Sequence, residues 1–122
     1  MALFRILQST DWSFLVGGEV IQIAIGFHQL QMNLTENIGI YIETDFAHEQ
    51  SGRPLSDATD LPTRSTTLIS LLGKVVERVE VEAEAESALI IHFSGGETLK
   101  IFPDDAPYES FQVTGPQGLI VV

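Results

Sequence analysis

A run of glutamates in the second half of the chain contains the residue types best suited to recognition. It comprises Glu77, Glu80, Glu82, Glu84 and Glu86. On a strand, residues two apart project to the same side at a spacing of ~6.6–6.8 Å. Glu80, Glu82 and Glu84 would then form a row of carboxylates, spaced much like successive phosphates of a nucleic-acid strand. Such a row suits a protein that occupies a basic cleft; the alternative is a solvated face that protects a strand from aggregation.

A second acidic group, Asp104 and Asp105, lies near the C-terminal end of the chain. Together with Glu109 it could supply oxygen ligands to a hard cation, but its spacing is not that of a calcium loop. We therefore expect Asp104 and Asp105 to extend the acidic face and predict no metal site.

The chain has three histidines, the residues that a metal site or a general base would most often use. Asp45, His48 and Glu49 are spaced i, i+3 and i+4, which would place them on one face of a helix. They follow an expected strand, however, so a solvated strand end is the simpler interpretation. We expect His92 to point outward from a strand and His28 to lie at a hairpin tip.

Motifs for nucleophilic or cofactor chemistry are missing from the sequence. There is no cysteine and no Gly-x-Ser-x-Gly nucleophile elbow. Gly17-Gly18 and Gly95-Gly96 lack the spacing of phosphate-binding loops, and Ser65 is explained as a helix cap. We therefore predict no catalytic residues, no cofactor and no enzymatic activity.

The charge balance narrows the classes of partner. Seventeen acidic residues face six basic ones, which gives a net charge of −11 for the 122 residues. Binding to nucleic acid or to anionic membranes depends on Lys and Arg, so neither is expected. The sequence has no apolar run of membrane-spanning length and no N-terminal signal pattern, which predicts a cytoplasmic protein.

The sequence contains an internal repeat, which sets the expected architecture. Residues 15–25 match residues 71–81, and residues 30–34 match residues 89–93, each followed by a spacer of five residues. The third segments, 40–42 and 99–101, also correspond. In each copy apolar residues alternate with polar ones, the pattern of half-buried strands.

We therefore predict a mainly β domain with minor α content over residues 1–122. It would consist of two pseudo-symmetric three-stranded antiparallel meanders, packed as a small sandwich or distorted barrel. The expected boundaries are repeat 1 at about 12–46, a linker at about 48–64, repeat 2 at about 65–105 and a C-terminal hairpin at about 108–122. One short helix, Ser65 to Leu72, would precede the second repeat and end at Gly73.

The layout resembles an uncharacterised family of small bacterial domains, some of them similar to immunity proteins encoded near polymorphic toxins. The resemblance rests on turns and core positions, and it is loose over most of the chain and better in the C-terminal half. It implies a fold but no catalytic residues. The segments that carry it are Leu72-Gly73 before Val76, the hairpin over 89–96, 99–101 with Pro103-Asp104, the run 108–113, Gly115-Pro116 and 120–122.

The net negative charge, the row of carboxylates and the family resemblance together favour a non-enzymatic acidic module that binds another protein. The hypothesis is an immunity protein that occludes a basic, nuclease-like toxin domain through Glu80, Glu82, Glu84, Asp104 and Asp105. One alternative is a structural homodimer or larger oligomer joined through strand edges. The other is a small-ligand or metal-binding protein that uses His48 with Asp45.

Overall fold

The computed structural model describes residues 11–27, 29–43, 46–55, 65–82, 88–102, 111–116 and 118–121. These residues form ten strands and two short 3-10 helices. The elements are η1 (Ser13–Leu15), β1 (Val20–Ile25), β2 (Leu30–Leu34), β3 (Ile38–Ile42), β4 (Phe46–Gln50), β5 (Arg53–Pro54), η2 (Thr66–Leu71), β6 (Val76–Glu82), β7 (Ala88–Phe93), β8 (Glu97–Ile101), β9 (Phe111–Gly115) and β10 (Gly118–Val121). The predicted mainly β fold is thus confirmed.

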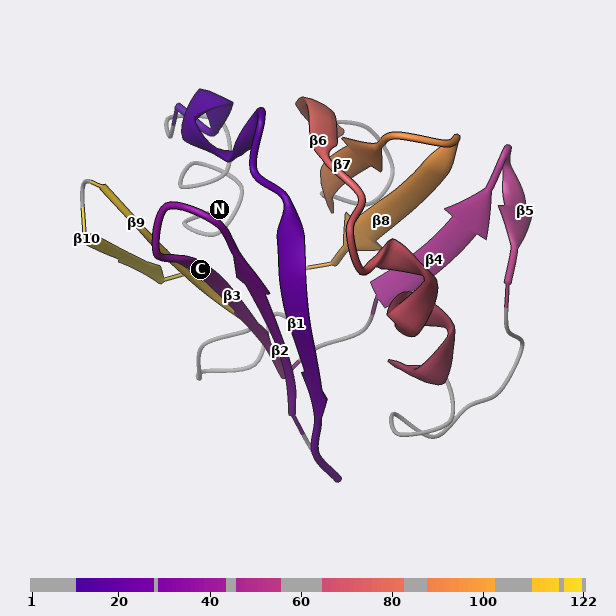
Figure 1. Cartoon of the computed structure of the whole chain (residues 1–122), viewed down its shortest axis with the longest axis horizontal. Coiled ribbons are helices and arrows are strands. Elements are labelled where there is room, and N and C mark those ends of the chain that lie inside the picture. The colour runs from indigo at the N-terminus through magenta and orange to yellow at the C-terminus, as the bar shows by residue number, and fades with distance from the viewer. Residues whose placement is uncertain are drawn as a thin grey trace.

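The strands form two five-stranded antiparallel sheets rather than one closed barrel. The first sheet has the order β1-β2-β3-β9-β10 and the second β5-β4-β8-β7-β6. Figure 1 shows the first sheet on the left and the second on the right. The hairpin β4–β5 follows β3 in the chain but pairs with β8, whereas β9–β10 follows β8 but pairs with β3. Each sheet therefore contains three consecutive strands and one hairpin from the other half of the chain.

The core lies between the sheets and follows from the alternation of side chains along each strand. Leu30, Met32 and Leu34 on β2 are all buried, as are Leu89, Ile91 and Phe93 on β7. A shift of one residue in either strand would turn these side chains toward solvent, so burial fixes the register.

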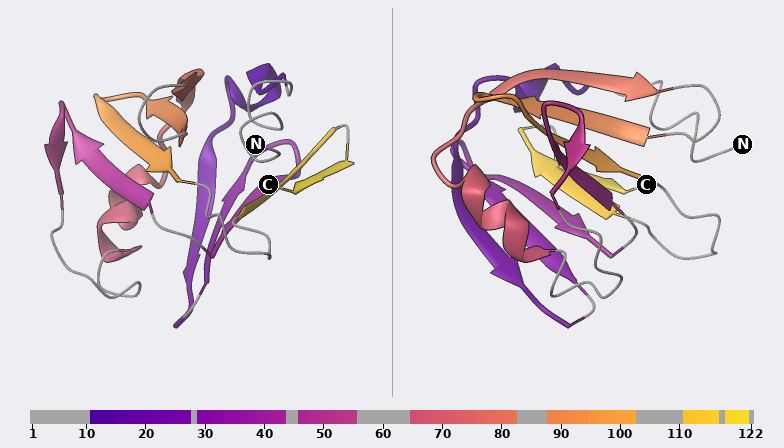
Figure 2. Two further views of the ribbon diagram at one scale, coloured as in Figure 1. Left: turned by 180° about the vertical axis from the view of Figure 1, so that it is seen from behind. Right: turned by 90° about the vertical axis from the view of Figure 1, so that its right-hand side faces the viewer.

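The helix predicted over Ser65 to Leu72 is present as the 3-10 helix η2, and Gly73 follows its C-cap with φ +84°. It lies beside β1, which it contacts (Figure 2). The expected cap, however, is wrong. Ser65 has helical dihedral angles, its side chain makes no capping bond, and its buried Oγ has no hydrogen-bond partner within the described part of the chain.

The segment expected as a linker contains structure at its start. Residues 46–50 form β4, and residues 53–54 form β5 after a turn at Ser51-Gly52. The cause is burial: Phe46 and His48 both face the core, although the composition of the segment is polar. The C-terminal hairpin is present as β9 and β10. The residues His28, Asp45, Glu84, Asp104 and Asp105, which the sequence analysis considered, lie outside the described residues.

Candidate functional site

The outer face of the second sheet brings Glu80 and Glu82 together on the edge strand β6. The burial pattern of β6 alternates: Val79 and Val81 are partly buried, whereas Glu80 and Glu82, which follow them, are exposed. Both carboxylates therefore project from the same side of one strand, as predicted. This side also carries outward residues of β4, β7 and β8.

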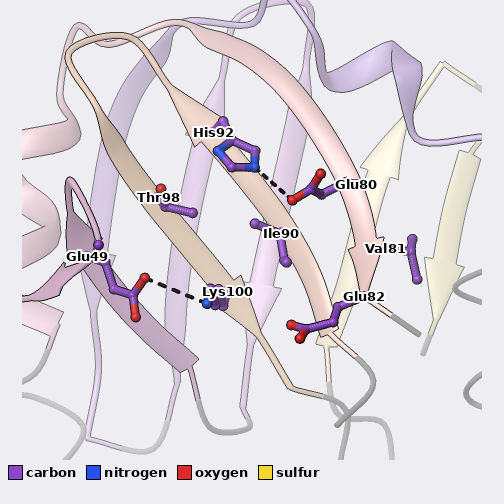
Figure 3. Close-up of a pocket in the computed structure, with 9 residues that line it drawn as sticks. Glu49, Glu80, Val81, Glu82, Ile90, His92, Thr98 and Lys100 are labelled. Atoms are coloured by element: carbon purple, nitrogen blue, oxygen red, sulfur yellow. Dashed lines mark hydrogen bonds and ion pairs between the residues drawn. The ribbon is translucent and has the colours of Figure 1, made fainter. Parts of the chain in front are cut away.

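Cross-strand register places these neighbours. Glu80 lies opposite Ile90 of β7, and Ile90 lies opposite Lys100 of β8. In the adjacent row His92 lies opposite Thr98, which lies opposite Glu49 of β4. The rows surround an open depression of about 680 Å³ (Figure 3). Its lining consists of Glu49, Gly52, Glu80, Val81, Glu82, Ile90, His92, Thr98 and Lys100.

Glu80 is partly neutralised by groups of its own chain. Its Oε1 lies 3.2 Å from Nε2 of His92, and its Oε2 lies 3.7 Å from the guanidinium of Arg78. Arg78 is also 3.3 Å from the same His92 nitrogen. The Glu80 side chain is 45% exposed and that of Arg78 64% exposed. Such ion pairs at a protein surface are worth about 1 kcal/mol or less, so a partner could displace them.

Glu82 differs from Glu80 because its carboxylate makes no ion pair or hydrogen bond with the described residues. On the opposite side of the depression, Nζ of Lys100 lies 3.7 Å from Oε1 of Glu49. Ile90 is only 6% exposed and forms an apolar floor beneath these charged groups. An apolar floor with a carboxylate at the rim can accept a long side chain that has an apolar stem and a cationic head.

A second polar cluster joins η2 to the inner face of the second sheet. His48 Nδ1 lies 2.8 Å from Thr67 Oγ1, and His48 Nε2 lies 2.9 Å from Glu97 Oε1. The Ser70 hydroxyl lies 2.5 Å from the same Glu97 oxygen. An ionised carboxylate only accepts, so Nε2–H of His48 donates to Glu97, and Nδ1 accepts from Thr67. Burial lowers the pKa of His48, while the bond to Glu97 and its charge act in the opposite direction.

The order hydroxyl, imidazole, carboxylate is that of a nucleophilic triad. A catalytic base must reach its substrate, however, and the His48 and Glu97 side chains are 2% and 4% exposed. We therefore interpret the cluster as a structural link. The sequence pattern suggested His48 with Asp45 as a candidate pair, whereas the structure pairs His48 with Glu97. The inward position of Glu97 could have been inferred from the alternation along β8, because Glu97, Leu99 and Ile101 are two residues apart and all face the core.

Neither cluster has the composition of a metal centre. Among the described residues, no group of three or more His, Cys, Asp or Glu side chains could hold a metal ion. In the same part of the chain, none of the helices combines the length and apolar character that crossing a membrane would require.

The fold and the depression define a mainly β domain of two antiparallel sheets with a charged outer face on one of them. The chain belongs to the Family of unknown function (DUF6188), whose model matches residues 13–122. This agrees with the expectation of an uncharacterised family. No curated protein and no solved structure matches the chain.

Proposed function

We propose that the protein is a non-enzymatic binding module that captures a basic protein through the outer face of its second sheet. The observation that carries the proposal is the pair Glu80 and Glu82, which project side by side from β6 at the rim of the depression. A Lys or Arg of the partner would lay its stem on Ile90 and place its cation against Glu82. It would also compete with Arg78 for Glu80.

The net charge of −11 supports this role by long-range attraction. Opposite fields raise association rates and select partners more than they raise affinity. Because Arg78 and Lys100 weaken the local field of the face, the attraction comes from the whole chain, and Glu80 and Glu82 determine where the partner docks.

The proposed biological setting is that of a bacterial, cytoplasmic immunity protein. It would occlude the basic cleft of a nuclease-like toxin domain without a cofactor. The acidic groups Glu84, Asp104 and Asp105 would extend the same face. What supports this setting is the acidic composition and the resemblance described above; occlusion needs binding but no chemistry.

We further propose that the two halves arose by duplication, which supplies an internal comparison for the site. Gly17 N–H donates to the Val76 carbonyl and Gly73 N–H to the Val20 carbonyl, both at 2.8 Å. Val20 and Val76, which correspond in the sequence repeat, each also precede a bulge, in β1 and β6 respectively.

The same correspondence, 56 residues apart, matches Glu80 with Ala24 and Glu82 with Gly26. The first copy therefore folds without carboxylates at these places. This supports a role for Glu80 and Glu82 outside folding.

Capture from cells tests the proposal. The tagged protein and its E80Q/E82Q variant would be used to isolate partners, with the product of the neighbouring gene as the first candidate. A matched control is E36Q/E43Q, which removes the same charge from exposed residues of the other half. We expect the control to retain the partner, the site variant to lose it, and the wild type to protect cells from that gene product. No complex and no protection would refute the proposal.

A further inference from the structure

The 3-10 helix η2 presents three distinct rows of side chains because this helix has three residues per turn. Leu68 and Leu71 form one row, which is fully buried in the core. Thr67 and Ser70 form the second row, which bonds to His48 and Glu97 of the second sheet. The third row begins with the exposed Thr66, and its next two residues are apolar although they face solvent: Ile69 is 53% exposed, and Leu72, at the C-cap, is 45% exposed.

The strand next to this row also exposes apolar side chains. In the order of the first sheet β1 is an edge strand, and it contacts η2. Gly73 N–H donates to the Val20 carbonyl, which brings the end of the η2 segment against the start of β1. Along β1 and just beyond it, Ile21, Ile25 and Phe27 are 57%, 36% and 76% exposed. We refer to Ile21, Ile25, Phe27, Ile69 and Leu72 as the β1–η2 surface.

The two segments that build this surface are free of charged residues. Residues 20–35 and residues 65–73 contain no Asp, Glu, Lys or Arg, although the chain has 23 such residues in total. In a protein with a net charge of −11, two copies repel each other least when they meet through uncharged faces, which keep the charges of the two copies apart. The β1–η2 surface meets this condition.

The edge strands β1 and β6 of the two sheets also differ in charge. Antiparallel pairing of β6 with a second β6 would bring Glu80 and Glu82 close to their own copies, and like charges across strands are destabilising. Pairing of β1 with a second β1 would bring together Gln22, Ala24 and isoleucines, which are compatible with themselves. A strand that is apolar, uncharged and at an edge is a template for such pairing.

We propose that the β1–η2 surface binds a second copy of this chain, with the two β1 strands antiparallel about a twofold axis. The apolar row of η2 would then be covered by the partner copy. This inference does not depend on the proposed function, since the acidic outer face belongs to the other sheet and remains open in the dimer.

The test is the mass of the purified protein over a concentration series, measured by light scattering and sedimentation. The wild type is expected to be a dimer whose dissociation constant does not rise with salt, because no ion pairs hold it. I25K and I69D should each raise that dissociation constant by about tenfold or more. The matched control is L55K, because Leu55 is exposed but lies after β5 of the other sheet; it should leave the dimer intact.

Circular dichroism and urea unfolding would show that each variant is folded. A wild type that stays monomeric at its highest soluble concentration would overturn the proposal. So would a dimer that I25K and I69D leave unchanged, or one that L55K disrupts equally. If the monomer instead captures another protein in a manner sensitive to I69D, this surface binds that protein and not a second copy.

Discussion

Nε2 of His48 lies 2.9 Å from Oε1 of Glu97, and both side chains are buried on the inner face of the second sheet. The two residues come from neighbouring strands, β4 and β8, and Thr67 and Ser70 of η2 bond to them. The pair therefore joins the β4–β5 hairpin, the central strand β8 and the 3-10 helix η2. Its role is to hold η2 over the core.

Loss of the Glu97 carboxylate should destabilise the fold. Glu97→Ala leaves the His48 Nε2–H without its acceptor in a buried site, which costs about 1–3 kcal/mol, while the Ser70 hydroxyl keeps the Thr67 carbonyl, 2.9 Å away, as an acceptor. Glu97→Gln keeps an acceptor oxygen and should cost less than half as much. Urea unfolding measures both values, and equal stability of Glu97→Ala and wild type would contradict the network.

Stability should fall in mild acid because of His48. Burial lowers the pKa of His48 below its ordinary value of 6.5. As the pH falls below 6.5, the unfolded chain takes up a proton that the folded chain does not, so folding loses free energy until the folded pKa is passed. His48→Gln should remove this part of the pH dependence, while His92→Gln should retain it. A His48→Gln protein with an unchanged pH profile of unfolding would refute the assignment.

The paired glycines should be sensitive to any side chain. Gly17 and Gly73 have φ values of +90° and +84°, and a Cβ at either position would meet no atom within 4 Å. Gly73→Ala should therefore destabilise through backbone strain alone, by roughly 1–2 kcal/mol, and Gly17→Ala by a similar amount. Asn tolerates the left-handed region and should cost less at both positions. If Ala and Asn were equally tolerated, strain would not be the reason for glycine here.

Much of the fold was predictable because alternation along a strand reports directly on burial. The inward residues of β2, β7 and β8 follow from the alternation of apolar and polar residues alone, and Gly73 marks the end of η2. The exchange of hairpins between sheets could not be predicted, since strand patterns carry no information about which neighbour a strand will choose. The sequence did not predict β4 because His48 is polar. The burial of His48 depends on its bond to Glu97, which is 49 residues away in the chain.

The site was predictable in part for the same reason. The two-residue repeat of side-chain direction along a strand predicted that Glu80 and Glu82 share one outer face. The sequence could not show, however, that His92 and Arg78 approach Glu80. Those contacts depend on the register of β6 against β7, including the bulge between Val76 and Arg78. The register also brings Lys100 and Glu49 to the same depression from strands distant in sequence.

Docking of a basic partner at Glu80 and Glu82 is the central element of the proposed function, and association kinetics test it directly. The association rate of the captured partner would be measured against ionic strength for wild type, E80K/E82K and the control E36K/E43K. E80K/E82K should slow association roughly tenfold or more at low salt, more than the control does, and the difference should shrink as salt rises. An equal effect of both variants, or a difference independent of salt, would contradict docking at this face.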